Sequence, residues 1–171
     1  KETAVAVPVG AQLISAQWSP DGKYIAAGNI TPAGIELWII DTASAKATKV
    51  KNVFVNTAFG GFGWEDSKTI SATLVSSKRG PAPAYQNITP TEPNIQETAG
   101  RTGAVQTFQD LLKSPNDERL FEYYCTSQLA MIDVSGKVRE IGSPAIYNNA
   151  DFSPDGKYIL TERIEHPFSY Q

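Results

Sequence analysis

The single histidine and the single cysteine are the residues of this sequence that most directly suggest chemistry. His166 and Cys125 are too few for a structural zinc site, which takes about four such ligands. A Ser-His-Asp triad has only His166 for its base, and the chain contains no Gly-x-Ser-x-Gly nucleophile elbow. We therefore expect no catalytic residue, metal or cofactor here. We expect Cys125 to be a small buried side chain at a helix-to-strand junction and His166 to lie at a strand end.

The Asp-Gly pairs at 21–22 and 155–156 are a second candidate, because carboxylates bind calcium. The alternating acids of a calcium-binding loop are absent around both pairs. Asp-Gly after Ser-Pro is instead typical of a tight turn, since proline fixes φ and glycine accepts a positive φ. We interpret both pairs as turn residues.

Composition excludes several function classes. The chain has 171 residues, with 18 acidic against 15 basic side chains and a net charge of -3, whereas nucleic-acid-binding domains are usually basic. No apolar run reaches the roughly 20 residues that a membrane span needs. A hydrophobic fraction of 41% indicates a folded chain. Because residue 1 is Lys1 and not Met, we expect an upstream segment to have been removed; we favour a periplasmic or secreted location.

An internal repeat predicts the fold. WSPDGKYI at 18–25 recurs as FSPDGKYI at 152–159, and a weaker copy, WEDSKTI, lies at 64–70. Each copy reads as the end of one strand, a tight turn and the start of the next strand. Further strand-like segments follow at a spacing near 40–45 residues, which is typical of the four-stranded antiparallel blades of a β-propeller.

The spacing predicts an all-β fold, a partial propeller of about two and a half blades. We expect one blade at residues 1–52, a second at 53–144 and the truncated start of a third at 145–171. The second blade has a predicted insertion at about 79–124, rich in proline at first and helical later. Two short helices are expected there, one at 107–113 and one that starts after Ser114, with proline at its first position and acids in its first turn.

Motifs within and after the insertion resemble one family. The segments are PNIQE at 93–97, TFQDLLK at 107–113, LFEYYCTSQL at 120–129, VREIGSPAIY at 138–147 and HPFSY at 166–170. They resemble the N-terminal propeller of the glutamyl endopeptidase branch of the prolyl oligopeptidase family of serine peptidases. The repeated hairpin alone also resembles TolB-like propellers.

The resemblance implies a propeller that restricts the entry of peptides to a C-terminal α/β-hydrolase domain, which carries the triad. This chain would then be a non-catalytic fragment, with peptides and the hydrolase domain as its partners and no activity of its own. The alternative is a non-enzymatic, TolB-like scaffold that binds a protein or a carbohydrate. We expect the open blade faces to be covered by self-association or by the remainder of a longer polypeptide.

The same resemblance draws attention to cations, because a peptidase that selects acidic side chains needs a positive charge to pair with a carboxylate. Arg101 and Arg79 are the substrate-binding candidates, and Lys78 and Arg163 are further cations of interest. Arg101 follows a glycine in the irregular half of the insertion. The alternative for each is a solvated loop residue, or an arginine that fastens the insertion to its blade.

Overall fold

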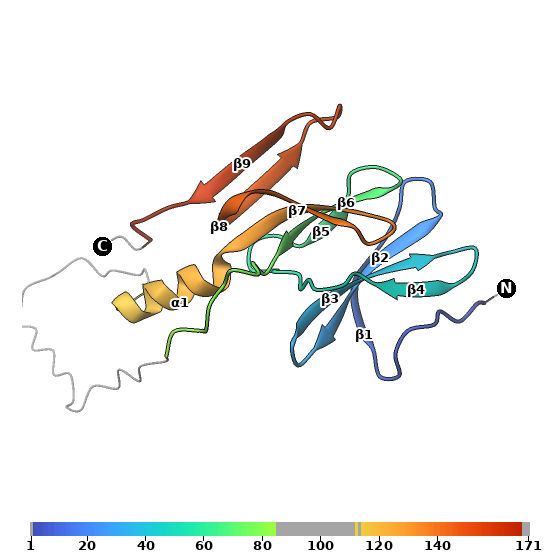
Figure 1. Cartoon of the computed structure of the whole chain (residues 1–171), viewed down its shortest axis with the longest axis horizontal. Helices are drawn as coiled ribbons and strands as arrows, with labels where there is room; N and C mark the ends of the chain where they lie inside the picture. The colour runs from blue at the N-terminus through green and yellow to red at the C-terminus, as the bar shows by residue number, and fades with distance from the viewer. Residues whose placement is uncertain (1, 85–111, 113, 169–171) are drawn as a thin grey trace, which may run out of the picture.

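The computed structural model describes residues 2–84, 112 and 114–168, and these form a mostly β structure (Figure 1). The first sheet is a four-stranded antiparallel meander in which each strand pairs with the next along the chain, in the order β1-β2-β3-β4. Its strands are β1 (Gln12–Trp18), β2 (Tyr24–Thr31), β3 (Gly34–Asp41) and β4 (Lys46–Lys49). This is the arrangement of a propeller blade, as the repeat predicts.

The second sheet has five strands in the order β5-β6-β7-β8-β9, again all antiparallel. The strands are β5 (Phe62–Trp64), β6 (Thr69–Leu74), β7 (Ser127–Asp133), β8 (Val138–Phe152) and β9 (Ile159–Ile164). Figure 1 shows the two sheets side by side, with the single described helix at the far end of the second sheet. The predicted fold class is confirmed.

Strand β8 explains why the second sheet has five strands. Its first part pairs with β7, with Val138 opposite Ile132, whereas its last part pairs with β9, with Phe152 opposite Ile159. Within the first part, the register against β7 shifts between Ile141 and Ala145, where Gly142 adopts a positive φ of 63°. One strand therefore serves as the last of one meander and the first of the next. The blade boundaries expected from the sequence stay predictions.

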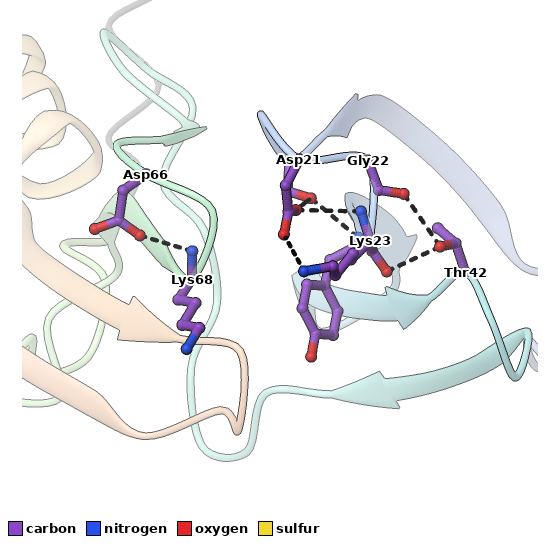
Figure 2. A network of polar contacts seen from close by, with 8 residues as sticks. Asp21, Gly22, Lys23, Thr42, Asp66 and Lys68 are labelled. Atoms are coloured by element: carbon purple, nitrogen blue, oxygen red, sulfur yellow. Dashed lines mark hydrogen bonds and ion pairs between the residues drawn. The ribbon is translucent and has the colours of Figure 1, made fainter.

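The first copy of the repeated turn is held by a carboxylate (Figure 2). Asp21 Oδ1 accepts hydrogen bonds from Ser19 Oγ at 2.9 Å and from Lys23 N at 3.2 Å. Gly22 adopts a φ of 71°, a conformation that side chains disfavour. Thr42 Oγ1 donates to the carbonyls of Gly22 and Lys23, so that the turn is tied to the end of β3. The interpretation of Asp21 as a turn residue is confirmed.

The later copies use the same chemistry. Asp155 Oδ1 accepts from Ser153 Oγ at 2.7 Å and from Lys157 N at 3.1 Å. In the weaker copy, Asp66 Oδ1 accepts from Lys68 N at 2.6 Å (Figure 2). The repeat in sequence is thus a repeat of one side-chain-to-backbone turn, which fixes the register of the strands on either side.

The core lies between the two sheets. Leu37, Val50, Ile70 and Ile132 are its largest fully buried side chains. Val55 connects the sheets, since its backbone pairs with Ile35 and Leu74, and Val55 N donates to Ile35 O at 2.8 Å. Each fully buried aliphatic side chain contributes about 1.5–3 kcal/mol relative to exposure. The two sheets are therefore one packed unit at this seam.

Helix α1 (Pro115–Cys125) lies in the chain between β6 and β7. Ser114 is its N-cap, accepting a hydrogen bond from Asp117 N at 3.2 Å, and proline occupies its first turn. The predicted cap, proline and first-turn acids are confirmed. The ring of Phe121 packs edge-on against Phe59, in the segment that precedes β5, with 6.1 Å between the ring centroids. The predicted helix at 107–113 lies outside the described residues.

Candidate functional site

A cavity of about 450 Å³ lies where β1, β5 and the last part of β8 converge. These three segments immediately precede the aromatic residues of the three repeat copies, Trp18, Trp64 and Phe152. They are the first strands of their meanders, which in a propeller lie nearest the central axis. We call this hollow the inner-strand cavity.

The inner-strand cavity is lined by aromatic rings, small residues, hydroxyls and amides, and none of its described lining residues is charged. The lining is Ile14, Ser15, Gln17, Thr57, Phe59, Gly60, Gly61, Phe62, Ser71, Ala72, Thr73, Leu129, Tyr147, Asn148, Asn149, Ala150 and Phe152. Side-chain amides donate and accept hydrogen bonds in the same way as peptide groups. The lining therefore suits an uncharged, extended polypeptide segment better than an ion.

Two strand irregularities face this cavity. The pairing of β1 with β2 shifts between Ile14 and Gln17, where Ser15 adopts a φ of 51°. The pairing of β8 with β9 shifts between Tyr147 and Asn149. A β-bulge changes the direction of side chains and interrupts the hydrogen bonds between two paired strands. Such bulges are enriched next to functional sites. Both bulges turn polar side chains of separate strands towards the same hollow.

Hydrogen bonds hold the base of the cavity in place. Gln17 Nε2 donates to Phe62 O at 3.2 Å, and Trp64 Nε1 donates to Gln17 O at 3.1 Å. Asn148 Nδ2 donates to the carboxylate of Glu162 at 3.2 Å. The first two bonds join β1 to β5 and thus one sheet to the other, so that the spacing of the cavity walls is set by the protein itself.

Arg79 lies against α1. Its guanidinium carbon is 4.0 Å from the ring centroid of Tyr123 and 5.1 Å from that of Tyr124. Among the described residues, its Nε and Nη2 atoms are buried and have no hydrogen-bond partner. Arg79, at the start of the predicted insertion, thus contacts the insertion's helix, and its role in binding substrate stays a prediction. Arg101, the other candidate, lies outside the described residues.

Of the two further cations, one lies near Arg79 and the other does not share its surroundings. Lys78, its neighbour in the chain, is exposed and lines the same hollow between α1 and the segment after β6. Arg163 belongs to β9 and lies 5.2 Å from the ring centroid of Tyr147.

His166 lies just beyond β9, as expected for a strand-end residue. Its ring stacks on Phe168 at 3.9 Å, and its Nε2 is 3.7 Å from Glu122 Oε1 on α1. Phe168 also contacts Phe121 at 5.1 Å. His166 therefore joins the chain after β9 to the helix, and no described serine or cysteine hydrogen-bonds to it.

Cys125 is the last residue of α1, immediately before β7, and its side chain is half-buried. Burial raises the pKa of its thiol above the ordinary value, although the charge of Arg79 opposes this shift. A raised pKa lowers the thiolate fraction at neutral pH, and the thiolate is the reactive form. The predicted place at a helix-to-strand junction is confirmed, whereas the side chain is half-buried and not buried as expected.

Neither a metal site nor a membrane helix is found in the described part of the chain. No group of three or more His, Cys, Asp or Glu side chains is placed there to hold a metal ion. Helix α1 has 11 residues and carries several charges, so it is too short and too polar to cross a bilayer.

The strand order and the repeated turns define the class of the protein: an all-β, propeller-type chain built from antiparallel meanders. The chain is 36% identical over 173 residues to a probable glutamyl endopeptidase, chloroplastic, of Oryza sativa subsp. japonica, an alignment that covers 95% of the chain. It is 34% identical to the protein of the same name from Arabidopsis thaliana, over 96% of the chain. The chain spans only 18% of the length of each relative.

The chain was also compared with solved structures and with protein-family profiles. The crystal structure of TolB from Acinetobacter baumannii aligns with 92% of this chain and 39% of its own, with 11% identity and a TM-score of 0.39. No protein-family profile matches the chain.

The sequence pattern did not reveal the inner-strand cavity, although it carried one signal. Residues up to four positions before each repeated aromatic, such as Ile14, Gly60 and Asn148, line this hollow. Aligning the three copies and asking which side chains they bring to one axis identifies these positions. The polar side chains among these positions, those of Ser15, Gln17, Asn148 and Asn149, are unusual for inward-facing strand positions and then mark a site rather than a core.

Proposed function

We propose that this chain is part of the propeller domain of a peptidase similar to the glutamyl endopeptidases, and that it limits the access of peptides to a separate catalytic domain. The observation that carries the proposal is the similarity to two relatives of that name over at least 95% of the chain. The absence of a nucleophile elbow from the sequence agrees with a non-catalytic part.

The inner-strand cavity supports this role. An uncharged lining of amides, hydroxyls and aromatic rings contacts peptide groups and side chains without selecting one charge. Side-chain amides and hydroxyls donate hydrogen bonds to the peptide groups of an extended segment and accept hydrogen bonds from them. In the proposed role, the hollow between β1, β5 and β8 belongs to the passage through which peptides travel, and its width sets which ones enter.

Turnover by the chain alone is the first test. The purified 171-residue chain is incubated with a fluorogenic peptide that has Glu before the scissile bond, and no cleavage is expected. The matched sample is a polypeptide in which this chain is joined to an α/β-hydrolase domain, where cleavage is expected. Cleavage by the chain alone that a serine-directed inhibitor abolishes would contradict the proposal.

A variant of the cavity tests the passage itself. A side chain at Gly61 meets no atom within 4 Å, so Gly61→Phe places a ring into the hollow without a backbone clash. In the joined polypeptide, we expect Gly61→Phe to slow the cleavage of long peptides more than that of short ones. Ala33→Phe, at an exposed residue in the turn between β2 and β3 that lines neither this cavity nor the hollow beside Arg79, is the control. An equal effect on all peptide lengths would refute the gating role and favour a binding scaffold.

A further inference from the structure

One wall of the inner-strand cavity is a short loop at residues 56–61, which we call the wall loop. Four of its residues line the cavity, namely Thr57, Phe59, Gly60 and Gly61. The wall loop belongs to no strand, because the preceding bridge is at Val55 and β5 begins after it. Strand pairing therefore does not determine the shape of this wall, and other contacts must do so.

Thr73 of β6 holds both ends of the wall loop. Its Oγ1 donates a hydrogen bond to Asn56 O at 2.8 Å, and its backbone N donates to Gly61 O at 2.8 Å. The backbone at Gly60 passes so close to this threonine that a Cβ atom there would lie 2.6 Å from Thr73 Oγ1. Glycine is the residue that permits such a close approach. The ends of the loop are therefore fixed, and Phe59 lies between them.

The ring of Phe59 is held by helix α1. It contacts the ring of Phe121 edge-on, with an angle of 77° between the two ring planes. Phe121 also contacts Phe168, in the segment after β9, with 5.1 Å between the ring centroids. An edge-on pair is favourable because the positive edge of one ring meets the negative face of the other. The orientation of Phe59 in the cavity wall thus depends on the helix.

Phe59 also presents an apolar surface to the cavity. The residue is 40% exposed although its ring lines a hollow that Phe62 and Phe152 line as well. Removing such apolar surface from water favours binding. A charged side chain would lose its hydration in this uncharged lining without gaining an opposite charge. The surface around Phe59 therefore suits an apolar side chain.

We propose that Phe59 is a specificity-determining residue of the inner-strand cavity, whose ring contacts an apolar side chain of a bound peptide, and that Phe121 is the positioning residue for this ring. The inference rests on the proposed function, which supplies a peptide as the ligand. Successive side chains of an extended peptide point to opposite sides, so that only some of them face Phe59. Helix α1 then influences which peptides the cavity accepts without itself lining it.

Isothermal titration calorimetry on the 171-residue chain with two uncharged peptides tests the proposal. The probes are acetyl-Ser-Gln-Phe-Gln-Ser-amide and its counterpart with Ala in place of Phe. We expect the Phe peptide to bind at least about tenfold more tightly, because its ring is removed from water. Binding is measured without cleavage, so that a failure here is distinguishable from a failure of the gating role, which the cleavage of long and short peptides reports.

Variants assign the preference to Phe59 and its support. Phe59→Ala is expected to weaken binding of the Phe peptide about tenfold and to leave that of the Ala peptide within about twofold. Phe59→Leu, which keeps an apolar side chain in the loop, is expected to reduce the preference about threefold. Phe121→Leu removes only the supporting ring and is also expected to reduce the preference about threefold, whereas Phe121→Tyr keeps a ring and should retain the preference.

The matched control is Tyr158→Ala, which removes an aromatic side chain that is 72% exposed and lies outside the cavity. We expect it to change neither affinity, and circular dichroism shows whether each variant keeps the fold. Equal affinity for the two peptides, or no binding of either, would overturn the proposal. So would an unchanged preference in folded Phe59→Ala and Phe59→Leu, or an equal loss in Tyr158→Ala. An unchanged preference in folded Phe121→Leu would overturn the positioning role of the helix.

Discussion

Replacing Asn56 with alanine is expected to detach helix α1 from the segment that precedes β5 and to destabilise the chain. Asn56 is only 8% exposed. Its Nδ2 donates to the carbonyls of Tyr124 at 2.9 Å and Thr126 at 3.1 Å, the orphan acceptors at the end of the helix. Its Oδ1 accepts from Ala58 N at 3.0 Å. One side chain thus joins two segments that are about 70 positions apart.

The magnitude follows from these three hydrogen bonds. Each contributes about 0.5–1.5 kcal/mol net, so that Asn56→Ala is expected to lower the free energy of unfolding by about 3 kcal/mol. For a chain of this size, that loss lowers the melting temperature by roughly 6–12 °C. Asn56→Asp is almost isosteric but turns a donor into an acceptor facing two carbonyls. We expect it to destabilise at least as much at pH 7, although its packing volume is unchanged.

Urea unfolding followed by tryptophan fluorescence and by far-UV circular dichroism measures both variants. Asn148→Ala is the control, because Asn148 is exposed and makes one side-chain bond to Glu162. An exposed substitution of this kind changes stability by about 0.5 kcal/mol or less. A loss below about 1 kcal/mol in both Asn56→Ala and Asn56→Asp would refute the assignment of Asn56 as the link between helix and sheet.

Three further outcomes are expected. Hydrogen bonds from Ser19 and Ser153 hold the pKa of the Asp21 and Asp155 carboxyls below the ordinary 3.8. The stability that these two carboxylates give the folded chain is therefore complete above pH 3.8 and is lost as the pH falls through the lowered pKa values. The double variant Asp21→Asn/Asp155→Asn should show a smaller fall of the urea midpoint between pH 7 and pH 3, and an unchanged fall would contradict this. Ile70→Ala, at a fully buried core position, should cost about 2–5 kcal/mol in the same urea assay, with a loss under 1 kcal/mol as the contrary result. Cys125, whose thiol pKa is raised by burial, should react with iodoacetamide at least about tenfold more slowly in the folded chain than in urea, and equal rates would show an exposed thiol.

The turns and the helix start were predictable because their signals are local. Ser-Pro-Asp-Gly determines its own hydrogen bonds within five residues, and the same bonds form around Asp21 and Asp155. Ser114 and the proline after it likewise fix the start of α1 without help from the rest of the chain. Local propensity and tertiary structure agree at these positions, so a reading of spacing alone was sufficient.

The sites were not predictable to the same degree, because they depend on contacts between distant segments. The inner-strand cavity exists only where three strands converge. Its shape depends on bulges at Ser15 and Asn148, which the residue types at these positions do not predict. The family resemblance indicates Arg79 as a cation of interest. Its stacking on Tyr123, 44 positions later in the chain, sets its orientation and follows from the fold alone.

Along the shared strand β8, the protection of backbone amides from hydrogen exchange is expected to decrease from its first part to its last part. The first part of β8 bonds to β7, which is itself paired with β6, whereas the last part bonds to β9, an edge strand whose Leu160 is 72% exposed. Amides in edge hairpins exchange with solvent through local opening, whereas interior amides need larger unfolding. Deuterium should therefore enter near Phe152 long before it enters near Val138, and burial of β9 by any neighbour should reduce that difference.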